Sequence, residues 1–261
     1  MLLVNKIAVI YGGAGAVGGA IARAFAREGA RVFLAGRTRA TLESVTAEIR
    51  AAGGLAEISV VDADDLAAVE QSLTAILAQT GRIDISVNAV SHDDVQGQTL
   101  LEMSHTLFAQ PIHKAMLSYF NTTTAAARHM ARQGSGVILA ISANAALQPA
   151  PTIGGFGVAC AAIEALCRQL AVEVSPQGVR VACLRSAGSP DAPGLREIFT
   201  ALAHEQGITF DEFCAQAANA IPLRHLPALT EVANAAVLAV SDYASAMTGA
   251  VINVTCGQVL D

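Results

Sequence analysis

The fold is decided by the stretch Tyr11-Gly12-Gly13-Ala14-Gly15-Ala16-Val17-Gly18. It follows an apolar run at 6–11 and opens an alanine-rich stretch of helical period at 18–28. Gly13, Gly15 and Gly18 fit the spacing G-x-G-x-x-G, in which glycines let the backbone approach a pyrophosphate at the positive end of a helix. The stretch therefore predicts a dinucleotide-binding loop between a first strand and a first helix. A loop kept small only for tight packing is the alternative.

The same alternation of strand and helix patterns continues along the chain. Continuous apolar runs, typical of buried parallel strands, lie at 6–11, 31–34, 56–61, 83–87, 136–141, 179–184 and 250–254. Stretches of helical period lie at 18–28, 40–52, 66–80, 113–132, 155–174 and 231–241. This order predicts one doubly wound α/β (Rossmann) domain over 1–261, with a seven-stranded, mostly parallel sheet and helices on both faces. The segment at about 190–227 breaks the rhythm, and we expect one or two lid helices over a pocket there.

Composition excludes several classes of protein. The 261 residues are 53% hydrophobic and 15% charged, with a net charge of -6 and a mean hydropathy of +0.47. The acidic balance argues against nucleic acid as a partner, and no apolar run reaches the length of about 18 residues that a membrane span needs. The five cysteines are scattered without C-x-x-C, so neither a disulfide framework nor a metal site is expected. The segment before the glycine loop is too short for a signal peptide, and we expect a cytoplasmic protein.

The end of the second expected strand bears on the choice of cofactor. It reads Leu34-Ala35-Gly36-Arg37. An enzyme that prefers NAD usually has an acidic residue at this strand end to hold the ribose hydroxyls. Arg37 can instead bind a 2′-phosphate through paired, charge-assisted hydrogen bonds. We therefore expect NADP(H) to be favoured over NAD(H), the alternative being that Arg37 is merely solvated at a helix start.

Motifs along nearly the whole chain resemble those of the short-chain dehydrogenase/reductase family. The glycine loop is similar to that family's T-G-x-x-x-G-x-G, with Tyr11 for the Thr and Ala16 for the middle Gly. Residues 84–91 are similar to D-x-x-V-N-N-A-G and keep its first Asn, and 178–181 match the family's entry into strand six. Residues 248–257 resemble its C-terminal T-G-x-x-x-x-V-D-G-G, with Thr255 and Cys256 in place of Asp-Gly. The segment 61–63 matches the place where the family's Asp touches the adenine. The resemblance implies cofactor contacts from Gly12, Gly13, Gly15, Val17, Gly18, Arg37, Asp62, Ala63, Asn88 and Ala89.

The resemblance fails at the residues that carry the family's chemistry, an Asn, a Ser and a Tyr-x-x-x-Lys. In the family the Tyr exchanges a proton, the Lys lowers its pKa, the Ser orients the carbonyl and the Asn supports a water relay. Counted from the neighbouring motifs, these four positions fall on Ala115, Ala143, Phe156 and Cys160. No Tyr-x-x-x-Lys exists anywhere in the chain, and the Tyr-x6-Lys of related enoyl-thioester reductases would need Ile153 and Cys160. The usual acid-base mechanism is therefore expected to be absent.

Several nearby side chains are candidates for substitute chemistry. Ser142 is the candidate catalytic residue, with a strand-end hydroxyl bonded to the backbone as the alternative. Cys160 has no cation near it in sequence, which favours a buried filler over a nucleophile. Lys114 could reach the pocket, but a solvated helix start is favoured. Residues 91–94, Ser-His-Asp-Asp, follow the fourth strand at the ligand-binding edge, and we interpret them as a polar loop.

These observations favour a divergent NADP(H)-dependent oxidoreductase that acts on a small apolar carbonyl or enone. Water or Ser142 would then supply the proton. The alternatives are a non-redox enzyme, such as an isomerase, cyclase or lyase, and a catalytically inactive nucleotide-binding scaffold on the same fold. A homodimer or homotetramer is expected, because the helix at 155–174 and the strand at 250–254 are apolar over much of their surface.

Overall fold

The computed structural model describes residues 1–260 and contains one parallel sheet. Its seven strands have the order β3-β2-β1-β4-β5-β6-β7, and every neighbouring pair is parallel. The strands are β1 (Ile7–Tyr11), β2 (Arg31–Gly36), β3 (Leu55–Val60), β4 (Ile85–Asn88), β5 (Gly136–Ala143), β6 (Val179–Ser186) and β7 (Ala250–Val254). The predicted doubly wound α/β fold is therefore confirmed.

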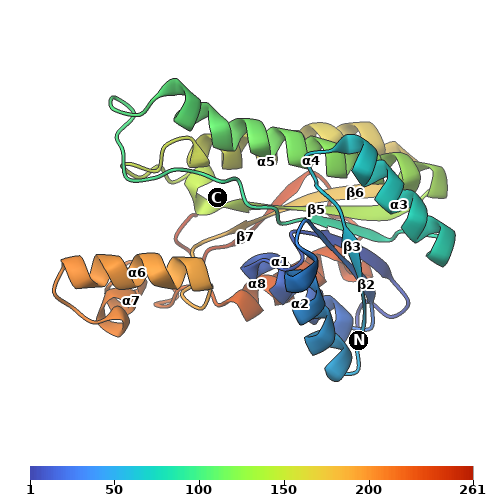
Figure 1. The fold of residues 1–261 in the computed structure, drawn as a ribbon, viewed down its shortest axis with the longest axis horizontal. Coiled ribbons are helices and arrows are strands. Elements are labelled where there is room, and N and C mark those ends of the chain that lie inside the picture. Colours follow the sequence, from blue (N-terminus) through green and yellow to red (C-terminus); the bar gives the residue numbers. More distant parts are fainter. Residues whose placement is uncertain (261) are drawn as a thin grey trace.

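Helices cover both faces of the sheet (Figure 1). The α-helices are α1 (Ala16–Arg27), α2 (Arg39–Ala51), α3 (Leu66–Thr80), α4 (His105–Gln133), α5 (Phe156–Val174), α6 (Pro193–Glu205), α7 (Phe210–Asn219) and α8 (Leu229–Val240). Short 3-10 helices lie at η1 (Asn144–Ala146), η2 (Ser175–Gln177) and η3 (Asp242–Ala244). Helices α1, α2 and α8 pack on one face, and α3, α4 and α5 pack on the other. Each layer has its own apolar core, which explains why the central strands are apolar on both sides.

The order of the strands places a crevice at the carboxyl ends of β1 and β4. The chain runs outward from β1 to β2 and β3, then returns to the other side of β1 to form β4. Helices that follow these strands therefore lie on opposite faces, and the connections leave a gap between them. Ligands of open α/β sheets bind in such a gap.

Helix α4 is longer than the sequence predicts. It begins at His105, with the Ser104 hydroxyl accepting a hydrogen bond from the amide of Leu107 at 3.3 Å. The helical period at 113–132 covers only its later part, and Pro111, which has no amide hydrogen, is a residue that usually ends a helix. Here Pro111 is buried inside the helix, and tertiary packing overrides its unfavourable propensity.

The segment 190–227 contains two helices, α6 and α7, which project from the body as an arm (Figure 1). The rings of Phe199 and Phe213 lie 5.1 Å apart and hold the two helices together. Thr209 begins α7 with a capping box, in which its hydroxyl and the Glu212 carboxylate bind each other's backbone amides. Within residues 1–260, no helix combines the length and apolar character needed to cross a bilayer.

Candidate active site

The glycine loop fits tightly between β4 and the start of α1. Gly12 has a φ of +73°, and a β-carbon there would lie 2.4 Å from the carbonyl oxygen of Ala89. A β-carbon on Gly18 would lie 2.2 Å from the carbonyl oxygen of Gly12. Glycine is therefore required at both positions. The N-cap of α1, Gly15, offers no side-chain cap, and the first turn contains no acidic residue. The first amide groups and the positive end of this helix are thus available to a phosphate.

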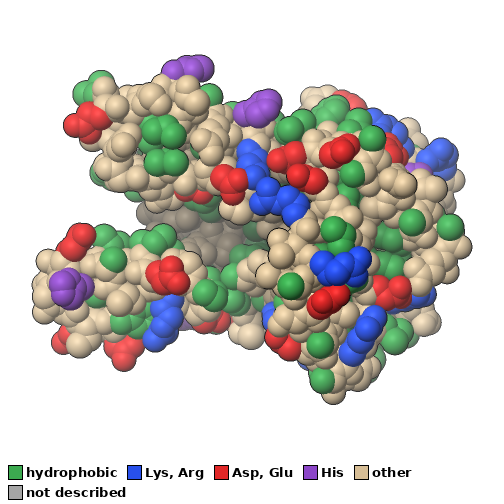
Figure 2. Space-filling view, in the orientation of Figure 1, with side chains coloured by type: hydrophobic (Ala, Val, Ile, Leu, Met, Phe, Trp, Pro, Cys, Tyr) green, Lys and Arg blue, Asp and Glu red, His purple; other side chains and the backbone are tan. Residues whose placement is uncertain are grey.

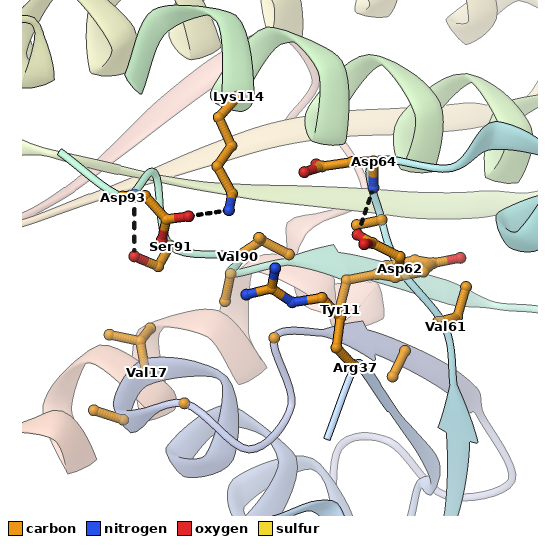
Figure 3. A pocket seen from close by; sticks show the side chains of 17 residues that line it. Tyr11, Val17, Arg37, Val61, Asp62, Asp64, Val90, Ser91, Asp93 and Lys114 are labelled. Carbon is orange, nitrogen blue, oxygen red and sulfur yellow. Dashed lines mark hydrogen bonds and ion pairs between the residues drawn. The ribbon is translucent and has the colours of Figure 1, made fainter. Parts of the chain in front are cut away.

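A first cavity of about 360 Å³ opens beside this loop (Figure 3). The loop residues and the ends of β2, β3 and β4 line it, and it brings together seven of the predicted cofactor contacts: Gly12, Gly15, Val17, Arg37, Asp62, Ala63 and Ala89. The remaining three, Gly13, Gly18 and Asn88, are not part of the lining. Asn88 is buried and holds the strand end, since its side chain donates to Thr122 at 2.9 Å and accepts from the amide of Val90 at 2.9 Å.

Arg37 is an exposed cation at the end of β2, and its guanidinium points into the first cavity below Lys114 (Figure 3). It forms no hydrogen bond or ion pair with any of residues 1–260. By contrast, Arg39 lies 3.6 Å from the carboxylate of Glu43. Arg37 acts on the carboxylate of Asp64 only at a distance, and a guanidinium without an ion pair at this position suits a phosphate group on the ribose.

Lys114 also lines the first cavity, which corrects its interpretation as a solvated helix start. Because α4 begins at His105, Lys114 lies within the helix and forms an ion pair with Asp93 (Figure 3).

The loop after β3 forms another wall of the first cavity. The side chain of Asn121 donates to the carbonyl oxygens of Ala63 and Asp64 at 3.1 and 3.0 Å and fixes this loop. Burial raises the pKa of Asp64, and the neighbouring carboxylate of Asp62 raises it further.

A second cavity of about 730 Å³ adjoins the first, between the ends of β4, β5 and β6 and the arm of α6 and α7. Figure 2 shows the molecule deeply hollowed on the side where the arm projects. Val17, Ala89 and Val90 line both cavities. Three of the four positions to which the resemblance assigns catalytic groups also line the second cavity, namely Ala143, Phe156 and Cys160. The fourth, Ala115, is fully buried in α4.

Ser142, the candidate catalytic residue, lines the second cavity and belongs to a buried polar network at its floor. Its hydroxyl donates to Glu164 at 2.8 Å, and the same carboxylate receives two hydrogen bonds from the guanidinium of Arg185, both at 2.8 Å. The side chains of Glu164 and Arg185 are each 3% exposed. The hydroxyl proton of Ser142 is therefore held by a carboxylate. No sequence pattern indicates this partner, which lies 22 positions further along the chain.

Two other groups of the second cavity are chemically quiet. Burial raises the pKa of Cys160 to about 12, so its thiol is neutral at ordinary pH, as expected of a buried filler. The hydroxyl of Tyr119 donates to the carbonyl oxygens of Asn88 at 3.1 Å and Ile141 at 2.7 Å. Burial raises the pKa of Tyr119 well above its usual value.

His92 also lines the second cavity, and unlike Tyr119 and Cys160 it can change charge near neutral pH. Its ring centre is 6.0 Å from that of Tyr119 and 5.8 Å from that of Phe156. The residue is 8% exposed, and its Nε2 is buried without a hydrogen-bond partner among the described residues. Burial lowers the pKa of His92, while Asp94 and Asp93 oppose that shift. The interpretation of residues 91–94 as a polar loop missed this side chain, and only its place just after a strand end could have signalled it.

A third polar group lies away from both cavities. His225 Nε2 is 3.1 Å from a Glu231 oxygen and 3.4 Å from the sulfur of Cys256. These atoms lie within 4.8 Å of one another on the surface. The hydrogen bond between His225 and Glu231 accounts for the cluster without an ion.

Comparison with known proteins identifies relatives along the full length of the chain. Residues 12–258 match the family described as enoyl-(acyl carrier protein) reductase. The chain is 29% identical over 260 residues to a 3-oxoacyl-(acyl-carrier-protein) reductase from Chlamydia muridarum, covering 98% of both chains. It superposes on a short-chain dehydrogenase/reductase family protein with a TM-score of 0.80 at 28% identity, covering 98% of each. It also superposes on NAD+-bound xylitol dehydrogenase with a TM-score of 0.89, covering 98% of this chain and 100% of that one; the identity of 22% shows the shared fold alone.

Proposed function

The chain belongs to the short-chain dehydrogenase/reductase family, and from this premise we propose that it is an NADP(H)-dependent oxidoreductase of apolar carbonyl compounds or enones. The observation that carries the proposal is the pairing of the two cavities. A glycine-lined cleft with a guanidinium that forms no ion pair adjoins a larger, mainly apolar cavity at the switch point of the sheet.

The residues of the first cavity fit a dinucleotide. Gly12 and Gly18 pack closely against neighbouring backbone, where a side chain would not fit. The uncapped first turn of α1 offers amide groups to a pyrophosphate. Arg37 would bind the 2′-phosphate, and Asp62 and Ala63 would border the adenine. When bound, the nicotinamide supplies or accepts a hydride. The contribution of this chain is to fix that ring against the second cavity.

The walls of the second cavity favour an apolar substrate. Phe156 comes from the body, while Phe199 and Phe213 come from the arm, and together they present aromatic surface to the interior. The volume of about 730 Å³ lies within the range of roughly 300–1,000 Å³ that is typical of small-molecule sites. An apolar ketone or enone would gain free energy here by leaving water.

The proton transfer must differ from that of the family. Ala143 cannot orient a carbonyl, Phe156 has no proton to give, and Cys160 supplies no fixed positive charge. Loss of general acid-base assistance typically costs about 10²–10⁴-fold in rate, so hydride transfer by positioning alone would be slow. Another group in the second cavity would have to carry the proton. The apolar character of these positions also favours, as a second candidate, a scaffold that binds the dinucleotide without turnover.

Calorimetry with NADPH and NADH tests the cofactor assignment. The parent protein is expected to bind NADPH more tightly, and Arg37→Glu is expected to reverse this order. Hydrogen bonds to a charged group contribute about 1.5–3 kcal/mol, which corresponds to a loss of roughly 10- to 100-fold in NADPH affinity. Arg39→Glu is the matched control, because Arg39 already faces Glu43 and lies outside the cavity lining. Equal affinities in the parent protein would refute the preference, and binding of neither nucleotide would refute the function.

Turnover is tested by following the absorbance of NADPH with a panel of apolar ketones and enones. Oxidation of NADPH that depends on one of these compounds supports the oxidoreductase. Tight NADPH binding without turnover of any member of the panel supports the non-catalytic scaffold instead.

A further inference from the structure

His92 is the only side chain of the second cavity that can change charge near neutral pH. Among the residues that line this cavity, the titratable ones are His92, Tyr119 and Cys160. The phenol of Tyr119 is engaged with two backbone carbonyls, and the thiol of Cys160 stays protonated. Imidazole, by contrast, ordinarily gains and loses its proton between pH 5 and 8. A proton exchanged with a bound molecule here has no other titratable side chain as its source.

The position of the ring agrees with such a role. The resemblance places the family's proton-exchanging Tyr at Phe156, and the His92 ring centre lies 5.8 Å from the ring of that residue. Tyr119 supports the ring from α4 at 6.0 Å. The imidazole therefore contacts two aromatic side chains, one of which occupies the position that the resemblance assigns to the proton-exchanging Tyr.

The unpartnered Nε2 is a second, independent observation. A buried polar atom without a hydrogen bond is unfavourable. Nε2 of His92 has no partner among residues 1–260, although the residue borders a cavity large enough for a small molecule. Nε2 is itself enclosed, so a turn of the ring toward the second cavity would be needed for a substrate oxygen to supply the missing hydrogen bond.

We propose that His92 is the acid-base residue of this site and exchanges a proton with the oxygen of an apolar carbonyl or alcohol in the second cavity. This inference rests on the oxidoreductase function proposed above. In reduction, the carbonyl carbon receives a hydride from reduced nicotinamide dinucleotide. The π-electron pair of the C=O bond moves to oxygen, and the oxygen takes the proton of the imidazolium. The products are the alcohol, the oxidised dinucleotide and neutral imidazole, which regains its proton from water. Oxidation of the alcohol is the reverse, with neutral imidazole as the base.

The surroundings of His92 set the direction of its pH dependence. Burial lowers its pKa below 6.5, Asp94 and Asp93 in its own loop raise it, and Lys114 of α4 lowers it. Tyr119 from α4 and Cys160 from α5 are neutral at these pH values. The neutral imidazole therefore predominates at pH 7 and is ready to act as a base. Alcohol oxidation should persist into mildly acidic solution and fall below the pKa of His92, whereas ketone reduction should rise as the pH falls toward that value.

The test compares the parent with His92→Gln, which retains hydrogen-bonding atoms but cannot titrate. His92→Phe is the second variant and replaces one ring by another against Tyr119 and Phe156. His113→Gln is the control, since His113 is an exposed histidine of α4. Rates of NADPH-dependent reduction of cyclohexanone and 2-cyclohexenone, and of NADP+-dependent oxidation of cyclohexanol, are measured against pH. The imidazole pKa of His92 is measured separately by NMR in the protein without nucleotide, with the signal assigned by its loss in His92→Gln.

We expect His92→Gln and His92→Phe to lose about 10²–10⁴-fold in rate and to keep the NADPH affinity of the parent. The change of slope that the parent's rate shows against pH on the acidic side, the kinetic break, should be absent from both variants. In the parent, the kinetic break and the NMR pKa should agree within about one unit. The inference is overturned if His92→Gln keeps both rate and break, if the two values disagree, or if the parent binds NADPH but converts none of the three compounds. A parent that binds no dinucleotide refutes the proposed function, and the inference with it.

Discussion

The buried pair of Glu164 and Arg185 offers the sharpest test of how this site is held together. Glu164→Gln keeps the shape of the side chain but removes its negative charge. The guanidinium of Arg185 then loses a negatively charged partner that contacts it through two hydrogen bonds of 2.8 Å, in a place where both side chains are 3% exposed. Breaking a buried pair from one side costs about 3–5 kcal/mol, because the attraction between the two charges is lost in an interior where water does not replace it. For a domain of this size, that corresponds to a fall of roughly 6–20 °C in melting temperature.

Urea denaturation at neutral pH measures this loss directly. The matched control is Glu48→Gln, whose partner Arg23 lies at 2.6 Å but is 45% exposed. Loss of an exposed pair costs only about 0.2–1 kcal/mol. A change of less than 1 kcal/mol for Glu164→Gln would contradict the reasoning. The double replacement of Glu164 and Arg185 by Met should recover much of the loss, because no charge then remains buried.

Ser142 connects this network to the question of catalysis. Its hydroxyl donates to the same carboxylate, so Ser142→Ala removes one hydrogen bond to a charged group, worth about 1.5–3 kcal/mol. We expect this variant to lose stability and to keep turnover and its pH profile. Loss of turnover without loss of stability would instead favour Ser142 as the group that contacts the substrate.

Three further predictions concern the loop, the vacated positions and assembly. Gly12→Ala should lower stability by about 1–2 kcal/mol or more in urea denaturation, since a positive φ becomes strained; an unchanged midpoint would contradict the loop geometry. Together, Ala143→Ser, Phe156→Tyr and Cys160→Lys should produce NADPH-dependent thermal stabilisation and carbonyl reduction that Phe156→Tyr alone does not; a folded triple variant that gains neither would show that these positions are misassigned. Light scattering at micromolar concentration should give a dimer or tetramer, because α5 exposes apolar residues such as Val172, and a monomer mass would rule this out.

The fold could be predicted because its signals are local. The glycine spacing at 12–18 and the buried apolar runs each depend on residues close in sequence, and alternation of strand and helix leaves few topologies. Much of the lining of the first cavity could be predicted for the same reason, because the carboxyl ends of neighbouring parallel strands meet at one edge of the sheet. Arg37 could be placed at that edge from its position after the second strand alone.

The chemistry of the second cavity depends on contacts that no short pattern contains. Glu164 meets Arg185 only because α5 packs on β6, and the two lie 21 positions apart. Lys114 was expected at a helix start, but α4 begins at His105 and continues through the buried Pro111, so Lys114 lies inside the helix. His92 stood in a polar stretch, and only the packing of Tyr119 and Phe156 around it distinguishes it from its neighbours. Sequence shows which side chains are present, whereas burial decides which of them can act.

The wall between the two cavities is formed by Val17, Ala89 and Val90, and sharing this wall has a thermodynamic consequence. These three side chains are common to both cavities, so an occupant of one cavity alters the surface offered to the occupant of the other. The two binding equilibria are then linked, and linkage is reciprocal: any factor by which a nucleotide tightens the substrate is the factor by which the substrate tightens the nucleotide. Enlarging or trimming Val90 would change that factor without removing a polar contact from either molecule. Cooperativity between the two ligands is thus adjustable through three apolar residues.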